Sequence, residues 1–306
     1  MALGRLTIGL WLIIAIQTSG VAVAVETASS ASQTKVRVIK VAAAKAEFAV
    51  AQDYFVTLLR LALEKGANGR IVPVIHDTQL MEQDLGVQEM IRGKKVDVYW
   101  MGTDQERERK LRPIRIPLDR GLIGHRRFII HQRMQGAFDG IRDLQTLSGY
   151  SACQGVDWPD TKVLQGAGLK VREIISFERI FKEVATLRCE YFPRGYFEGY
   201  SEVTQRKEAY PELMFYEKLI LEYPFALYFF VNAKDEELAR WIETGLEKMI
   251  DEGRLLEHMK THPLTRNVFP LNKVKDVRWI HIDNPDMPAG TDYSNPRYWF
   301  QPDDFK

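Results

Sequence analysis

The sequence contains few residues with thiol or imidazole chemistry. Among its 306 residues are two cysteines, Cys153 and Cys189, and six scattered histidines. Two cysteines without a neighbouring histidine pattern do not make a zinc site, so we expect no metal. In an oxidising compartment the two cysteines could form one disulfide, and the alternative is a pair of small buried apolar side chains. Sequence alone does not decide between these two structures, because it does not fix the distance between the cysteines.

An excess of either charge is also lacking, since 42 basic residues are matched by 41 acidic ones. Bulk nucleic-acid binders carry a marked basic excess, so we expect no nucleic-acid partner. The sequence shows no internal repeat and no low-complexity segment after a short linker at 27–34. The chain is therefore expected to fold almost from end to end.

The motifs of common catalytic sites are missing as well. The sequence has no glycine-rich phosphate loop, no Gly-x-Ser-x-Gly nucleophile elbow and no histidine pair at metal-binding spacing. His76 alone, or Glu198 or Glu202, would need a catalytic partner close by. We therefore expect a binding protein without a cofactor rather than an enzyme.

Long apolar runs are confined to the first residues. Arg5 precedes an apolar run at 6–16, and small residues then lead to Ala22-Val23-Ala24. This is the pattern of a cleavable signal peptide, and the run is shorter than the roughly 20 residues that a bilayer-spanning helix needs. We expect a signal peptide at 1–24, cleavage after Ala24 and a protein of the periplasm. The alternative is an uncleaved membrane anchor.

After these residues the sequence alternates between strand and helix patterns. The remaining chain is longer than one compact core usually accommodates, so two lobes are expected. The first expected elements are strands at 36–41, 70–75 and 96–101 and helices at 51–65 and 80–92. This βαβαβ order predicts a mostly parallel open sheet, whose ligands bind beyond the carboxyl ends of the strands.

A second α/β unit is expected after a crossing near 127–131. Its expected elements are helices at 138–147, 160–167 and 177–187 and strands at 150–154 and 171–175. The chain then returns at 224–231 and forms an amphipathic helix at 235–252. We therefore expect an α/β protein of two lobes, each an open mixed sheet flanked by helices, joined by two hinge strands. The expected lobe 1 comprises 25–131 plus 225–306, which includes the C-terminal tail, and lobe 2 comprises 132–224. The aromatic, proline-rich tail at 279–305 could wrap lobe 1, and the alternative is that it meets a membrane partner.

Several short phrases also occur in a recognisable order. They are Val96-Asp97-Val98 followed by Gly102-Thr103 and Glu106-Arg107, then Gln154-Gly155, then Arg188-Cys189-Glu190-Tyr191-Phe192, then Leu238 with Trp241. Over about 36–269 the chain resembles the bacterial extracellular solute-binding proteins of family 3, the polar amino-acid-binding class with a type II periplasmic-binding fold. The resemblance implies a monomer whose hinged lobes close over a small molecule for a membrane permease of the ABC type. The alternatives are a ligand sensor that signals to a membrane receptor and, as a further option, a periplasmic enzyme on the same fold.

The resemblance also implies site residues in the first lobe. An arginine after the third strand grips the ligand carboxylate in the family, and Arg107 lies at the matching position. Its planar guanidinium suits bidentate binding of a carboxylate. Thr103 could add a hydroxyl, and Trp100 at the end of the same strand is a further candidate contact. The alternative is that Arg107 belongs to a solvated charge run at the head of a helix.

In the second lobe the chain departs from the family pattern. Asp157 stands where the family commonly has a hydroxyl residue, and a carboxylate there would repel a carboxylate ligand. Arg194 lies near the position of the aspartate that receives an amino acid's ammonium, and it has the wrong sign. A rearranged site that uses Asp157 or Glu198 for a cation is the alternative. The candidate ligand-binding residues are therefore Trp100, Thr103, Arg107, Asp157 and Arg194, and Arg126 or Arg127 could instead fix the hinge through a carboxylate.

Overall fold

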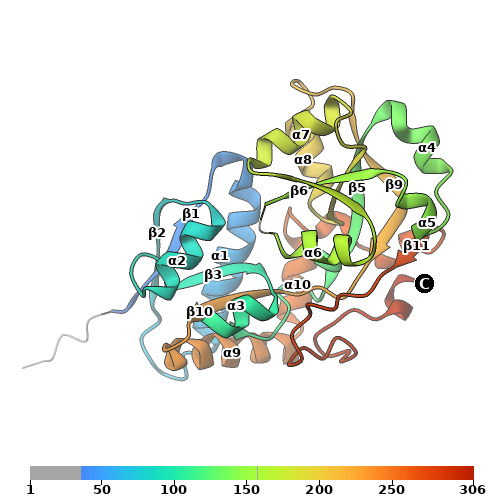
Figure 1. The fold of residues 1–306 in the computed structure, drawn as a ribbon. Helices are drawn as coiled ribbons and strands as arrows, with labels where there is room; N and C mark the ends of the chain where they lie inside the picture. Colours follow the sequence, from blue (N-terminus) through green and yellow to red (C-terminus); the bar gives the residue numbers. More distant parts are fainter. Residues whose placement is uncertain (1–35, 157) are drawn as a thin grey trace, which may run out of the picture. The chain divides into compact units, whose positions relative to one another are not determined.

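The computed structural model describes residues 36–156 and 158–306, which form one compact unit with two α/β lobes (Figure 1). The predicted signal peptide at 1–24 and the candidate Asp157 lie outside the described residues. Within the described part, every helix is too short or too polar to span a membrane.

The described part of lobe 1 contains five strands and the helices that cover them. The parallel pair β1-β2 lies beside a three-stranded antiparallel sheet of order β3-β10-β4. The strands are β1 Val38–Ala43, β2 Val74–Leu80, β3 Val98–Gly102, β4 Leu111–Ile114 and β10 Leu227–Asn232, and the helices are α1 Ala49–Lys65, α2 Gln83–Ile91, α3 Gln105–Lys110 and α9 Glu236–Asp251. The predicted βαβαβ order is therefore present, and β10 returns from the far end of the chain to pair with β3 and β4.

Helices α1 and α9 pack with their backbones in close contact. The apolar stripe of α1, which includes Leu58, Leu59 and Ala62, is completely buried. Gly245 of α9 faces Ala62 so closely that a Cβ atom built on it would lie 1.8 Å from the Ala62 carbonyl oxygen. The indole nitrogen of Trp241 donates a hydrogen bond to the Leu63 carbonyl at 2.8 Å. The absence of a side chain at position 245 thus sets how closely the two helices approach.

We expect Gly245→Ala to lower the free energy of unfolding by about 1–3 kcal/mol, because the added methyl group must push two backbones apart. Chemical denaturation would measure the loss. Gly136→Ala is the matched control, since a Cβ atom there would meet nothing within 4 Å. An equal effect of the two substitutions would contradict the close packing of the helices.

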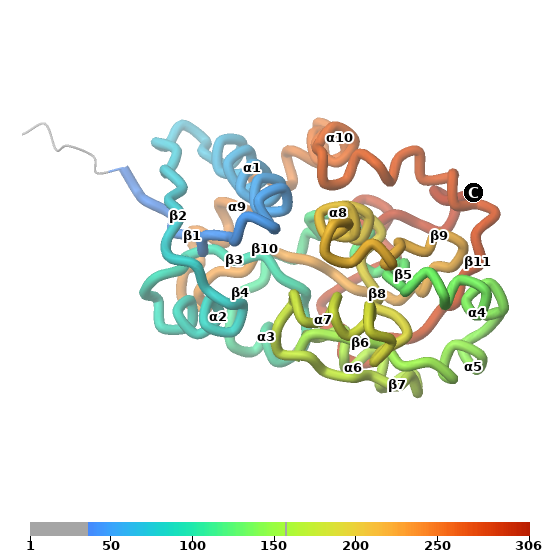
Figure 2. Tube along the Cα trace, turned by 90° about the horizontal axis from the view of Figure 1, so that it is seen from above, coloured from blue at the N-terminus to red at the C-terminus, as the bar shows by residue number. Residues whose placement is uncertain are grey.

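Lobe 2 is built on a six-stranded sheet of order β11-β9-β5-β8-β6-β7 (Figure 2). Its strands are β5 His125–His131, β6 Ser151–Gly155, β7 Lys170–Ile174, β8 Tyr191–Gly195, β9 Leu213–Glu222 and β11 Arg278–His281. Its helices are α4 Gln135–Asp139, α5 Leu144–Leu147, α6 Pro159–Gly166, α7 Phe177–Ala185 and α8 Gly199–Gln205. Helix α10 Arg254–Thr261 packs instead on lobe 1, where the His258 imidazole lies 3.2 Å from the Tyr54 carbonyl of α1. Central strand β5 is fully buried.

Two of the described segments that connect the lobes lie between β4 and β10. The first runs from β4 to β5, and the second runs from β9 to β10. They lie side by side, since the Tyr223 amide donates to the Gly124 carbonyl at 3.2 Å and the Leu118 amide donates to the Leu227 carbonyl at 3.0 Å. The first crossing is earlier than predicted, because β5 at 125–131 belongs to the sheet of lobe 2 and not to lobe 1.

The tail also differs from the prediction, which assigned it to lobe 1 alone. Strand β11 pairs in parallel with β9 and so extends the sheet of lobe 2. Farther along, Arg297 forms ion pairs at 2.5 Å with Glu247 and Asp251 of α9 in lobe 1. Phe305 near the end of the chain stacks on His125 of β5 with ring centroids 4.7 Å apart. The tail therefore contacts both lobes, because its apolar rings and its strand find partners on each.

Candidate ligand-binding site

A cavity of about 690 Å³ lies between the two lobes. Residues that follow β1, β2 and β3 line it from lobe 1, and residues that follow β6, β7 and β8 line it from lobe 2. The carboxyl ends of strands are where open α/β sheets bind ligands. The volume falls within the roughly 300–1,000 Å³ of small-molecule sites. This cavity is the candidate site.

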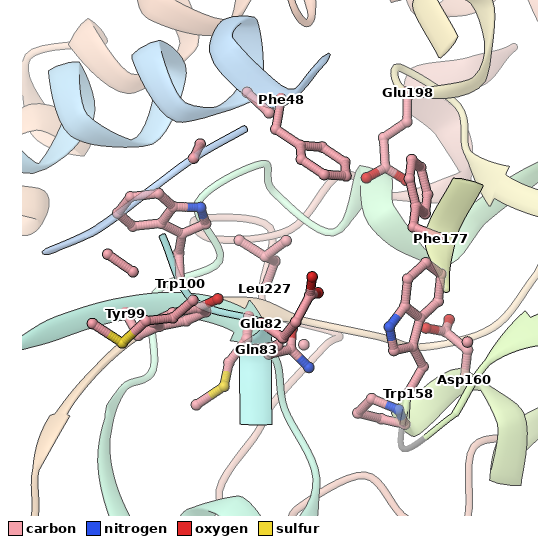
Figure 3. A pocket seen from close by; sticks show the side chains of 18 of the residues that line it. Phe48, Glu82, Gln83, Tyr99, Trp100, Trp158, Asp160, Phe177, Glu198 and Leu227 are labelled. Carbon is pink, nitrogen blue, oxygen red and sulfur yellow. The ribbon is translucent and has the colours of Figure 1, made fainter. Parts of the chain in front are cut away.

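Aromatic side chains from both lobes line the cavity (Figure 3). In lobe 1, Trp100 stacks on Phe55 with ring centroids 5.4 Å apart. In lobe 2, the centroids of Trp158 and Phe177 are 6.2 Å apart. The ring centroids of Phe48, just before α1, and Phe177 are 4.9 Å apart, so aromatic rings of the two lobes are in contact. Such faces suit a flat or a cationic ligand.

A buried ion pair joins β5 to α6 in the wall of lobe 2. The Arg126 guanidinium on β5 contacts the carboxylate of Asp160 at the start of α6, and the two side chains are 2% and 7% exposed. The hydroxyl of Tyr223 donates to the same carboxylate at 2.5 Å. The Arg126 guanidinium also lies 5.4 Å from the ring centroid of Phe225 in the second crossing. This pair connects the cavity wall to the second crossing.

A second ionic group lies at the ends of β8 and α8. Arg194 donates two hydrogen bonds to the Glu202 carboxylate, at 2.6 and 2.8 Å, and its Nη2 lies 3.0 Å from Glu198. Burial acts to lower the pKa of Arg194, but the carboxylates of Glu198 and Glu202 outweigh it and raise that pKa. Burial raises the pKa of Glu198, although Arg194 and Arg126 oppose this shift. The Glu198 carboxylate also accepts a hydrogen bond from the Gly195 amide at 2.9 Å, and this bond orients it.

The charged residues of lobe 1 are also paired. Lys45 donates to Glu82 at 2.7 Å, and both side chains are well exposed. The Arg107 guanidinium donates a hydrogen bond to the Gly102 carbonyl at 2.7 Å and lies near the Asp104 carboxylate. The Asp104 side chain caps α3, because it accepts a hydrogen bond from the backbone amide of Arg107. Burial lowers the pKa of Arg107. Among the described residues, no group of three or more His, Cys, Asp or Glu side chains could hold a metal ion.

Comparison with known proteins places this arrangement in a fold. No family model matches the chain, and no curated protein matches it. Solved structures do match. An ancestral amino-acid-binding protein, described as a precursor of cyclohexadienyl dehydratase, has a TM-score of 0.53 and 14% identity, and the match covers 74% of this chain and 94% of that one. A mutant of ArgBP from T. maritima has a TM-score of 0.52 and 15% identity over the same shares of the two chains.

A third match is a periplasmic His/Glu/Gln/Arg/opine family-binding protein from Silicibacter pomeroyi in complex with lysine. Its TM-score is 0.51 at 14% identity, and the match covers 68% of this chain and 85% of that one. The chain has the type II periplasmic-binding fold. The two-lobed α/β class and the resemblance predicted from the sequence are thus confirmed at the level of the fold.

Within this periplasmic-binding fold, three of the candidate residues lie in the cavity wall. Trp100, Arg107 and Arg194 line it. Arg107 is buried and is held by a backbone carbonyl, so it is not part of a solvated face. Arg194 is enclosed by Trp158, Phe177 and Phe192, whose ring centroids lie 5.1 to 5.5 Å from its guanidinium.

Thr103, another candidate, is not among the residues that line the cavity. Its hydroxyl donates to Glu108 at 2.8 Å, and its amide donates to the Ala226 carbonyl at 2.9 Å. Glu108 in turn pairs with Arg115. The hydroxyl therefore supports a structural ion pair at the start of the first crossing.

The sequence does not predict two features of the cavity wall. The sequence pattern predicts only that a helix begins at Asp160, and it does not identify the carboxylate that Arg126 or Arg127 would bind. Phe48 precedes α1 and Phe177 begins α7. No local sequence pattern predicts that their rings are in contact.

The structure also joins Cys153 and Cys189 in a disulfide, with Cα atoms 5.6 Å apart.

Proposed function

We propose that this protein is a periplasmic binding protein that captures a small polar organic molecule in the cavity between its lobes. The observation that carries this proposal is that both lobes line one cavity beyond the carboxyl ends of their strands. A ligand that contacts both walls stabilises the arrangement in which both walls reach it. The two crossings are the segments that would absorb the rotation of the lobes.

The proposed ligand contacts are Trp100, Arg107 and Arg194, which lie in the wall. An amino-acid-like ligand is proposed because the compared structures include an arginine-binding and a lysine-bound protein of this fold. The proposed partner is a membrane permease of the ABC type that meets the closed form of a monomer. These assignments rest on the fold and on the cavity together.

Binding is proposed rather than catalysis, although this fold does not separate the two. One of the compared proteins is described as the precursor of a dehydratase. In the present cavity, the carboxylates of Asp160 and Glu198 contact arginines. Their ion pairs with these guanidinium groups account for both buried carboxylates without a catalytic role. A cavity with a few convergent polar groups is where a small molecule is expected to bind.

Thermal unfolding of the purified protein against amino acids, organic acids, amines and short peptides tests the proposal. A ligand that binds only the folded state adds about 2.7 kcal/mol at 100 times its Kd, which is about 5 °C in melting temperature for a chain of this size. We expect at least one class to produce such a shift. Trp100→Ala is expected to reduce the shift, because Trp100 lines the cavity.

The control for this experiment is Tyr200→Ala, since Tyr200 is exposed and lies outside the cavity wall. Its ligand-induced shift is expected to equal that of the unaltered protein. If no compound of any class shifts the melting temperature, the proposed function is wrong. If a hit is unaffected by Trp100→Ala, the ligand binds elsewhere.

A further inference from the structure

The basic side chains that line the cavity already have acceptors. Four basic residues belong to the wall, and each is bound by a carboxylate or a carbonyl oxygen of the protein. The pairs are Lys45 with Glu82, Arg107 with the Gly102 carbonyl, Arg126 with Asp160, and Arg194 with Glu202. The protein's own acceptors orient these side chains and partly neutralise their charge. The wall of the cavity is therefore poorly prepared for an anion.

The carboxylates of lobe 2 exceed its arginines in the same region. Arg126 and Arg194 face Asp160, Glu198 and Glu202, so two positive charges meet three negative ones. Of these three acids, Glu198 has the most exposed side chain, at 21%, whereas the side chains of Asp160 and Glu202 are 7% and 12% exposed. Glu198 is therefore the carboxylate of this group that is most open to the cavity.

The Glu198 carboxylate is directed toward aromatic rings of the cavity wall (Figure 3). Figure 3 shows it directed toward Phe48 and Phe177, with Trp158 nearby. A cation near a carboxylate and against ring faces gains from both the ion pair and the ring quadrupole, and the gain is largest where water is displaced. The faces of the same rings are negative and would repel an anion.

We propose that the cavity selects organic ammonium ions through Glu198, and that a ligand carboxylate is not required. This inference rests on the proposed function, because it names the ligand class of the same cavity. The carboxylate of Glu198 accepts hydrogen bonds from the ligand's ammonium group, and the rings of Phe48 and Phe177 cover its carbon chain. The Gly195 amide and Arg194 hold the carboxylate in position.

Three probes with the same carbon chain length test the ligand class: butylamine, butanoate and γ-aminobutyrate. Isothermal titration calorimetry on the purified protein measures the Kd of each. We expect butylamine and γ-aminobutyrate to bind with similar affinity and butanoate to bind at least about tenfold more weakly. Butanoate binding as tightly as butylamine would overturn the inference. This comparison needs no substitution.

Glu198→Gln tests the residue. The amide keeps the size of the side chain and removes its charge, so butylamine is expected to bind at least about tenfold more weakly. Glu217→Gln is the matched control, because Glu217 also pairs with an arginine of β5 but lies outside the cavity wall. It is expected to leave the Kd of butylamine unchanged. Butylamine affinity that survives Glu198→Gln would overturn the assignment to Glu198.

The results separate the failure of this inference from that of the proposed function. Binding of amino acids or organic acids without binding of butylamine leaves the proposed function standing and refutes the ammonium selectivity. Binding of no compound in either experiment refutes both. Circular dichroism and thermal unfolding of Glu198→Gln verify that it folds. If it does not fold, Phe48→Ala takes its place, with the same expected weakening for butylamine and the same contradicting result.

Discussion

Replacing Arg126 with methionine is expected to lower the free energy of unfolding by about 3–5 kcal/mol. The substitution leaves the carboxylate of Asp160 buried without its guanidinium partner, and only 7% of that side chain is exposed. The Tyr223 hydroxyl stays as a neutral donor to Asp160, and it cannot neutralise the charge. Urea denaturation with a fitted m-value would measure the loss.

The double variant Arg126→Met, Asp160→Asn is expected to recover much of this loss. Removing both charges of a buried pair eliminates the desolvation cost that one remaining charge would carry. Arg127→Met is the control on the neighbouring position of β5. Its partner Glu217 is 66% exposed, so water solvates the carboxylate after the substitution and a much smaller loss is expected. A loss for Arg127→Met as large as that for Arg126→Met would contradict a role for buried charge.

Local patterns predicted the elements whose apolar faces are regular. The three strands and two helices of the first βαβαβ unit occur in the predicted order, and β1, α1 and β3 each carry a buried apolar run or stripe. The predicted strand at 70–75 is displaced, however, and β2 is Val74–Leu80. Asn68 and Gly69 adopt positive φ angles, and Pro73 precedes the strand, so the turn extends farther than expected. The strand itself is mostly exposed and polar.

The helix predicted at 138–147 is two short helices. Helix α4 ends at Asp139, and Gly140 follows it. Asp143 then begins α5 by accepting the Thr146 amide at 2.8 Å. The apolar spacing continues through both pieces, so periodicity alone could not detect the interruption. The capping residue was the available signal, since aspartate three positions before a helical amide favours a new start.

Long-range pairing accounts for what the sequence did not predict. Strand β8 contains Pro193 and lies between β5 and β6, although proline is usually confined to sheet edges. Strand β11 comes from the tail and pairs with β9, about 60 residues earlier in the chain. In the site, the position of Arg194 could be read from the sequence, but its partner Glu202 lies in a helix that was not predicted. Partners of this kind depend on the fold and not on local patterning.

The disulfide between Cys153 and Cys189 is the second feature whose removal should have a large effect. It closes a segment with a sequence separation of 36 residues, which includes β7 and α7. Restricting the unfolded chain by a loop of this length is worth about 4 kcal/mol in the chain-entropy account. We expect the double variant Cys153→Ala, Cys189→Ala to lose about that much free energy of unfolding, as measured by chemical denaturation without reductant.

The unaltered protein denatured in reductant is the matched control for the disulfide, because it lacks the bond but keeps both side chains. We expect it to agree with the double variant within about 1 kcal/mol, the remaining difference coming from the lost sulfur atoms. Stability of the double variant equal to that of the oxidised protein would contradict the expected role of the bond. Cys153 lies in β6, which leads to Asp160, and Cys189 precedes β8, which leads to Arg194 and Glu198. The bond therefore connects the strands that position both ionic groups of the cavity wall, so its loss should weaken ligand binding along with stability.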